Sequence, residues 1–152
     1  MYEIFTNIVC PFFGTLAFAV LYQVPKQYYL ACGLTGVYGW VAYYFVSFVT
    51  TPAVASFVGT LVVVLMSRML TVRMKCPITI FLIAGIFPLV PGAGIYQTVY
   101  YIVTNQLTIA ASKGMTALKV AFGIVLGIAI VVSIPRDFFR FDYWRNKFRQ
   151  KS

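Results

Sequence analysis

Residues 87–101 read FPLVPGAGIYQTVYY and interrupt a long apolar run. A helix interior avoids proline, because proline lacks the amide that pairs with the carbonyl four residues earlier. Pro88 and Pro91 each leave one such carbonyl without its helical donor. Gly92 and Gly94 follow at once, and glycine allows both positive φ and close approach of other backbone. The stretch therefore predicts a half-helix, an unwound turn and a second half-helix.

The composition of the chain indicates a protein embedded in lipid. Of its 152 residues, 61% are hydrophobic and 10% are charged, whereas a soluble domain carries about a quarter charged residues. Histidine is absent, and the three acidic residues (Glu3, Asp137 and Asp142) lie outside the apolar segments. These side chains supply no metal cage, carboxylate pair or histidine base, so we expect a protein that is not an enzyme and uses no metal or cofactor. The three cysteines form no CxxC pair, which is typical of small buried hydrophobic residues.

The apolar segments predict an all-α integral membrane protein with about five transmembrane helices, the fourth broken at Pro88–Gly94. A spanning helix needs about 20 apolar residues, and the first piece of the fourth segment is too short to cross alone. A polar connection over 104–114 precedes the fifth helix. Residues 1–135 are predicted to form one polytopic domain and residues 136–152 a tail. The expected helices are Ile4–Tyr22, Leu30–Val49, Ala53–Leu70, Ile78–Val90 with Ile95–Val103, and Ala117–Ile134.

The distribution of positive charge predicts the orientation of these helices. Lysine and arginine concentrate on the cytoplasmic side of membrane proteins. With five spans and an outside N-terminus, Lys26, the Arg68–Lys75 group and six basic tail residues fall inside, while Lys113 and Lys119 fall outside. We therefore expect the N-terminus outside and the C-terminus in the cytoplasm.

The tail, PRDFFRFDYWRNKFRQKS, combines basic residues with aromatic residues at helical spacing. An aromatic helix face with a basic rim is typical of a segment that lies on anionic lipids. The net charge of +9 is therefore interpreted as lipid contact and orientation, and no nucleic-acid partner is expected. Docking of a partner subunit on the tail is the alternative.

Polar residues follow the break at helical spacing and form the candidate substrate site. Tyr96 and Tyr100 are four residues apart, and Gln97 and Thr98 lie between them. Such side chains can line a cavity and hydrogen-bond a small polar ligand, while free amides at a half-helix start attract anionic groups. The alternative is a proline-kinked helix whose tyrosines sit at the membrane interface. The predicted substrate-binding residues are Pro88, Pro91, Gly92, Gly94, Tyr96, Gln97, Thr98 and Tyr100.

Small residues recur at spacings that favour helix packing. In lipid, such residues let two helices approach closely. The sequence does not reveal whether the partner helices belong to this chain or to another. The predicted packing glycines are Gly33, Gly36 and Gly39 in the second helix and Gly123 and Gly127 in the fifth.

The stretch PLVPGAGIYQTVYY resembles the P-x-x-PG-x-G-x-Y-x-T-x-Y element of the threonine/serine exporter family, in the C-terminal membrane portion of its members. The segments CPFFGTLAFAVLYQVPKQ, GLTGVYGWVAYYF and GIVLGIAI are similar to other parts of the same portion. The resemblance covers about residues 10–135, and its length suits the small component of exporters that are split into two chains.

The resemblance implies a subunit of a secondary transporter that exports small amino acids, threonine or serine, across the cytoplasmic membrane. It implies a larger membrane subunit as partner and coupling to an ion gradient. Because no acidic residue lies inside an expected span, a proton-coupling group is expected in the partner. Two alternatives stay open, a non-transporting scaffold or assembly subunit and an exporter of small dicarboxylates such as succinate.

Overall fold

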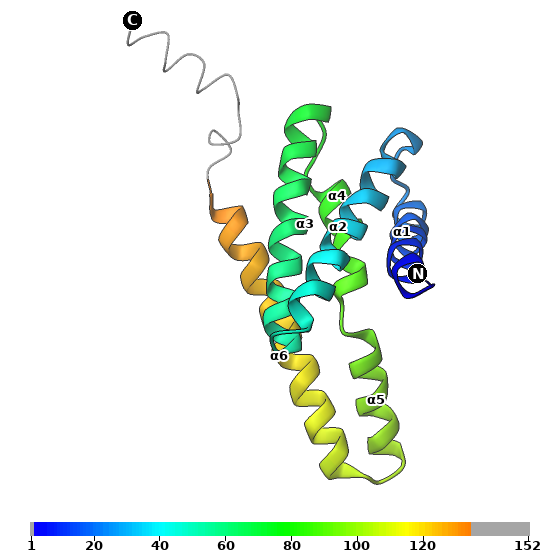
Figure 1. Cartoon of the computed structure of the whole chain (residues 1–152), viewed down its shortest axis with the longest axis vertical. Helices are drawn as coiled ribbons and strands as arrows, with labels where there is room; N and C mark the ends of the chain where they lie inside the picture. Colours follow the sequence, from blue (N-terminus) through cyan, green and yellow to red (C-terminus); the bar gives the residue numbers. More distant parts are fainter. Residues whose placement is uncertain (1, 135–152) are drawn as a thin grey trace, which may run out of the picture.

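A computed structural model describes residues 2–134, and the predicted basic tail lies outside this range. The described chain is helical throughout, apart from short connections, as the apolar pattern predicts (Figure 1). The elements are α1 (Tyr2–Leu21), η1 (Lys26–Tyr28), α2 (Tyr29–Ser47), α3 (Pro52–Met74), α4 (Thr79–Ile86), η2 (Phe87–Leu89), α5 (Gly92–Val103) and α6 (Leu107–Ser133).

The helices have the length and apolar character of a membrane protein. Three elements are long and apolar enough to cross a bilayer, namely the η1–α2 unit, α3 and α6. The pair formed by Thr79–Leu89 and Gly92–Val103 adds a fourth crossing if its two halves are one bent span. The apolar part of α1, Phe5–Leu21, is shorter, and α1 is seen almost end-on where α3 and α6 run lengthwise (Figure 1).

Helix α6 begins ten residues earlier than the sequence predicts, so the expected polar connection over 104–114 is wrong. Only Thr104–Gln106 separates α5 from α6. The turn is tight because Asn105 adopts a left-handed conformation with φ 58°, and the Gln106 amide donates to the Tyr101 carbonyl at 2.8 Å. Polar side chains are accommodated in this helix, as the Thr116 hydroxyl shows by donating to the Ser112 carbonyl at 3.0 Å.

Helix α3 is central to the packing, because it contacts both α2 and α6. Glycine residues allow the helices to approach closely in both contacts. A Cβ added at Gly39 would meet the Val63 side chain of α3. A Cβ added at Gly123 would lie 2.6 Å from the Ala53 carbonyl oxygen of α3. The other predicted packing glycines also face helices of this chain: Gly33 faces Phe12, Gly36 faces Thr15 and Gly127 faces Thr60.

Arg68 is a buried cation that ties α3 to the end of α6. Its side chain is 7% exposed, and its guanidinium donates to the Val132 carbonyl at 2.7 Å and also to the Ile134 carbonyl. The last carbonyls of a helix have no intrahelical partner and carry partial negative charge, which a cation stabilises. Arg68 therefore caps α6, a role that its membership in a basic cluster did not indicate.

Candidate functional site

The chain breaks its fourth apolar segment between η2 and α5, at the predicted position. Val90 is extended, and the Gly92 amide donates to the Val90 carbonyl at 2.7 Å. Pro91, between them, has φ −77° and ψ 53°, close to the values of an inverse γ-turn. The helix axis changes direction by 49° between the two halves. The break is thus a γ-turn on proline that redirects the chain.

The two glycines after Pro91 show only one of the two properties expected of them. No glycine among the described residues has positive φ, so conformational freedom is not what they supply. An added Cβ at Gly92 would meet nothing within 4 Å, whereas one at Gly94 would lie 3.3 Å from the Ala117 Cβ. Gly94 therefore permits close approach of α5 to α6.

The polar side chains of α5 do not converge on one point within this chain. Tyr96 is 70% exposed and Tyr100 is 52% exposed, and their rings stack with centroids 6.4 Å apart. Gln97 is also exposed. Thr98 instead donates to the Gly94 carbonyl at 2.7 Å and faces Gly114 of α6. The predicted site residues thus divide between an exposed tyrosine face and the contact with α6.

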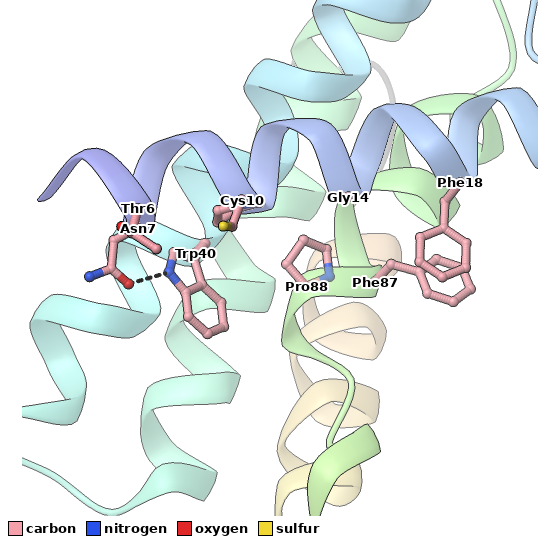
Figure 2. Close-up of a pocket in the computed structure, with 9 residues that line it drawn as sticks. Thr6, Asn7, Cys10, Gly14, Phe18, Trp40, Phe87 and Pro88 are labelled. Carbon is pink, nitrogen blue, oxygen red and sulfur yellow. Dashed lines mark hydrogen bonds between the residues drawn. The ribbon is translucent and has the colours of Figure 1, made fainter. Parts of the chain in front are cut away.

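A cavity of about 350 Å³ lies beside the break, and its lining includes neither of these tyrosines (Figure 2). Phe87 and Pro88 of η2 form one wall and Trp40 of α2 another. The remaining lining comes from one face of α1, where the residues are Thr6, Asn7, Cys10, Pro11, Gly14 and Phe18. Pro88 is the predicted site residue that reaches this cavity.

The cavity has a polar end and an aromatic end, which lie apart in Figure 2. At the polar end the Trp40 indole N–H donates to Asn7 Oδ1 at 3.1 Å. At the aromatic end the rings of Phe18 and Phe87 stack with centroids 3.5 Å apart and planes within 13°. A small amphipathic solute fits such a division, because polar groups fix orientation and aromatic walls bury apolar surface.

The residues of α1 that line the cavity were missed from the sequence. Asn7 and Pro11 carried the available signal, since an amide and a proline are both unfavourable in an isolated membrane helix. Both lie in the first expected helix, Ile4–Tyr22, but the sequence gave no way to know that α1 packs against η2. Pro11, inside the continuous helix α1, and Pro88 of η2 line the same cavity.

The contact between α5 and α6 makes a testable prediction about Gly94. Replacing Gly94 by Ala should lower the midpoint of thermal unfolding of the chain, because the new methyl group pushes against Ala117. Ala117→Gly should destabilise the Gly94→Ala chain less than it destabilises the wild-type chain, because there it also removes the opposing methyl group. Unfolding midpoints of the wild-type chain, the two single variants and the double variant in detergent form the measurement. Equal costs of Ala117→Gly in both backgrounds would mean that Gly94 and Ala117 do not press on each other.

Comparison with known proteins identifies the family. The family model described as "Threonine/Serine exporter, ThrE" matches residues 7–134. A curated protein of Corynebacterium glutamicum, named "Threonine/serine exporter", is 31% identical over 127 residues, which are 81% of this chain and 26% of that protein. The chain thus spans about a quarter of that relative's length. No solved structure matches significantly. The broken helix, every residue that lines the cavity except Thr6, and nearly all other described residues lie within the matched range, and the chain belongs to the threonine/serine exporter family.

Proposed function

We propose that this chain is one subunit of a secondary transporter that exports small amino acids, threonine or serine, across the cytoplasmic membrane. The observation that carries the proposal is the break at η2–α5, inside the part of the chain that matches the exporter family. In lipid, irregular backbone persists only where protein buries it or where it lines an aqueous cavity. Discontinuous helices of this kind form the substrate sites of many transporters.

The substrate site is proposed to lie at the break, formed by the residues from Pro88 to Tyr100 that the sequence singles out. The first intrahelical bond of α5 runs from the Ile95 amide to the Pro91 carbonyl at 3.1 Å. The amides of Ala93 and Gly94 therefore lie before the first intrahelical hydrogen bond of α5. They carry the partial positive charge of a helix N-terminus. A carboxylate of the substrate is the group that this end attracts.

A larger membrane subunit is proposed as the partner. The chain spans about a quarter of the length of its curated relative, and this supports an exporter to which a second chain contributes. Tyr96, Gln97 and Tyr100 of α5 are exposed and place polar groups where lipid would satisfy none of them. We propose that this face meets the partner across the substrate path. A proton-coupling group would then belong to the partner.

The proposed orientation keeps the N-terminus outside and the tail in the cytoplasm, against anionic lipids. The positions of Lys26, Arg73 and Lys75 support this arrangement, because all three lie near helix ends that the proposal assigns to the cytoplasmic side. The break then lies between the two membrane faces rather than at one of them.

The test is export from intact cells loaded with a dipeptide that contains threonine or serine. Export is expected only when this chain and the larger subunit are produced together, and not with either one alone. Efflux of the released amino acid is measured in the medium, with succinate efflux followed in parallel. Export by the larger subunit alone would assign this chain to assembly. Succinate efflux without amino-acid efflux would assign the complex to dicarboxylates.

A further inference from the structure

Lys119 is a cation in the middle of a helix that is long enough to span the membrane. Helix α6 has 27 residues, which make about 40 Å of helix at about 1.5 Å per residue. Lys119 lies at about the midpoint between Leu107 and Ser133, the two ends of α6. The hydrocarbon core of a bilayer is about 30 Å thick, so a helix whose ends reach its boundaries holds Lys119 well inside it. In the expected helix Ala117–Ile134 the same lysine lay near the outer end.

The side chain of Lys119 lies on an exposed and otherwise apolar face of α6. Ala117 and Val120 are buried, whereas Lys119 is exposed. Met115 and Phe122, four residues before it and three after it, share its helix face and are 55% and 60% exposed. The charge therefore points away from the helices of this chain, toward whatever lies beside α6 in the membrane.

The chain itself offers no counter-charge at this depth, because the sequence from Ile4 to Ile134 contains no aspartate or glutamate. Glu3 lies in the first turn of α1, which packs on α2, α4 and η2, whereas α6 packs on α3 and α5. Asp137 and Asp142 belong to the tail, which the proposed orientation places in the cytoplasm. Since a charge inside a membrane is costly unless it is paired, the lysine needs a carboxylate from another chain.

Lys119 is level with the break in the fourth apolar segment. Helices α5 and α6 pack antiparallel, since Gly94 faces Ala117 and Gly114 faces Thr98. This register places the first residues of α5 beside the turn of α6 that contains Lys119, in the hairpin that extends past the connection between α2 and α3 (Figure 1). A group that pairs with Lys119 therefore lies at the depth of the proposed substrate site.

The charge of the chain disfavours a second copy as the source of the carboxylate. The net charge is +9, and both lysines of α6, Lys113 and Lys119, are exposed. Two copies that met through α6 would bring lysine against lysine, and like charges across an interface are unfavourable. A transmembrane helix of a different chain, with one acidic residue at this depth, fits the charge and the apolar surface around it.

We propose that Lys119 forms an ion pair inside the membrane with an aspartate or glutamate on a transmembrane helix of the larger subunit. The inference rests on the proposed two-chain exporter and adds the residue that joins the two chains beside the break. The partner helix covers Met115 and Phe122 and excludes water, which strengthens the attraction between the two charges. The pair also fixes the register of the two chains, because it requires the carboxylate at the depth of Lys119.

A cross-link without a spacer tests the pair. The complete two-chain complex in membrane vesicles is treated with dicyclohexylcarbodiimide, which enters lipid and activates a carboxyl group. The Lys119 amine attacks the activated carbonyl carbon, an amide bond forms and dicyclohexylurea leaves, so the chains are joined with net loss of water. Mass spectrometry should identify a peptide that contains Lys119 linked to one acidic residue of the larger subunit. Lys119→Arg should keep the complex and abolish the link, whereas Lys113→Arg should change neither.

Neutral variants separate an ion pair from a lysine that extends to the lipid headgroups. Lys119→Gln should lower the recovery of the larger subunit with this chain by about tenfold or more, because it leaves a carboxylate unpaired. Changing the cross-linked acidic residue to its amide in the same complex should restore recovery, because no charge then remains unpaired. Lys113→Gln, nearer to the start of α6, is the matched control and should leave recovery unchanged. Equal recovery with Lys119→Gln and with the wild type would contradict the pair.

Other outcomes of the cross-linking distinguish the ion pair from the proposed function. A complex that copurifies and exports threonine but gives no product at Lys119 rejects the ion pair and leaves the proposed function standing. A product that joins Lys119 to Glu3 of a second copy rejects the larger subunit as the source of the carboxylate. Failure of the two chains to copurify under all conditions rejects the proposed two-chain exporter itself.

Discussion

Replacing Gly123 by Ala should destabilise the folded chain by about 1–3 kcal/mol, the usual cost of overpacking. The new Cβ would lie 2.6 Å from the Ala53 carbonyl oxygen and 3.6 Å from the Phe57 amide nitrogen. Both atoms belong to the backbone of α3, so no side-chain rotation relieves the contact and the two helices must separate. The measurement is the midpoint of thermal unfolding of the purified chain in detergent.

Two other glycines serve as comparisons for this prediction. Gly39→Ala should also destabilise the chain, because the added methyl group meets the Val63 side chain, which is fully buried and, being β-branched in a helix, keeps one rotamer. Gly14→Ala should keep or raise the midpoint, because nothing lies within 4 Å of the new Cβ and alanine favours helix by about 1 kcal/mol over glycine. A Gly123→Ala chain as stable as the Gly14→Ala chain would contradict the close packing of α3 on α6.

The combined replacement Pro88→Ala and Pro91→Ala should abolish most transport while leaving the complex intact. Each exchange favours a helix by about 3 kcal/mol, so together they favour a continuous helix over the 49° bend. Straightening the segment removes Pro88 from the cavity wall and displaces the start of α5. We expect export to fall by about tenfold or more, which corresponds to about 1.4 kcal/mol or more of lost transition-state stabilisation. Efflux and recovery of the complex are measured on the same cells.

Pro52→Ala is the matched control for the proline replacements. Pro52 occupies the first turn of α3, where the missing amide has no intrahelical acceptor to lose. Its replacement should therefore change neither the path of the helix nor the rate of export. A loss of export equal to that of the double variant would show that transport is sensitive to proline removal in general.

The position of the break and the family could be predicted from the sequence because both are encoded locally. Two prolines within four residues interrupt a helix wherever they occur, and the structure places the turn on Pro91. Of the two properties expected of these glycines, positive φ occurs at neither Gly92 nor Gly94, whereas close approach is found at Gly94, where an added Cβ would lie 3.3 Å from the Ala117 Cβ of α6. The sequence pattern around Gly94 could not show that α6 packs against it.

The start of α6 and the cavity depend on packing between distant segments. The polar stretch after Thr104 resembles a loop by hydropathy, yet it is helical from Leu107 onward, and its Gly114 lies against Thr98 of α5. The cavity needs α1 to pack against both α2 and η2. No spacing within α1 encodes that arrangement, so Asn7 and Cys10 became site candidates only with the structure.

The most direct test of the central claim, that the broken helix forms the transport site, is exchange of labelled threonine in liposomes. Liposomes that contain the purified complex are loaded with unlabelled threonine, and entry of the labelled amino acid is followed. The wild-type complex and the Pro52→Ala control should exchange at the same rate, whereas the Pro88→Ala/Pro91→Ala complex should exchange at about a tenth of that rate or less. Exchange at the wild-type rate by the double variant would contradict the claim and reduce the break to a kink.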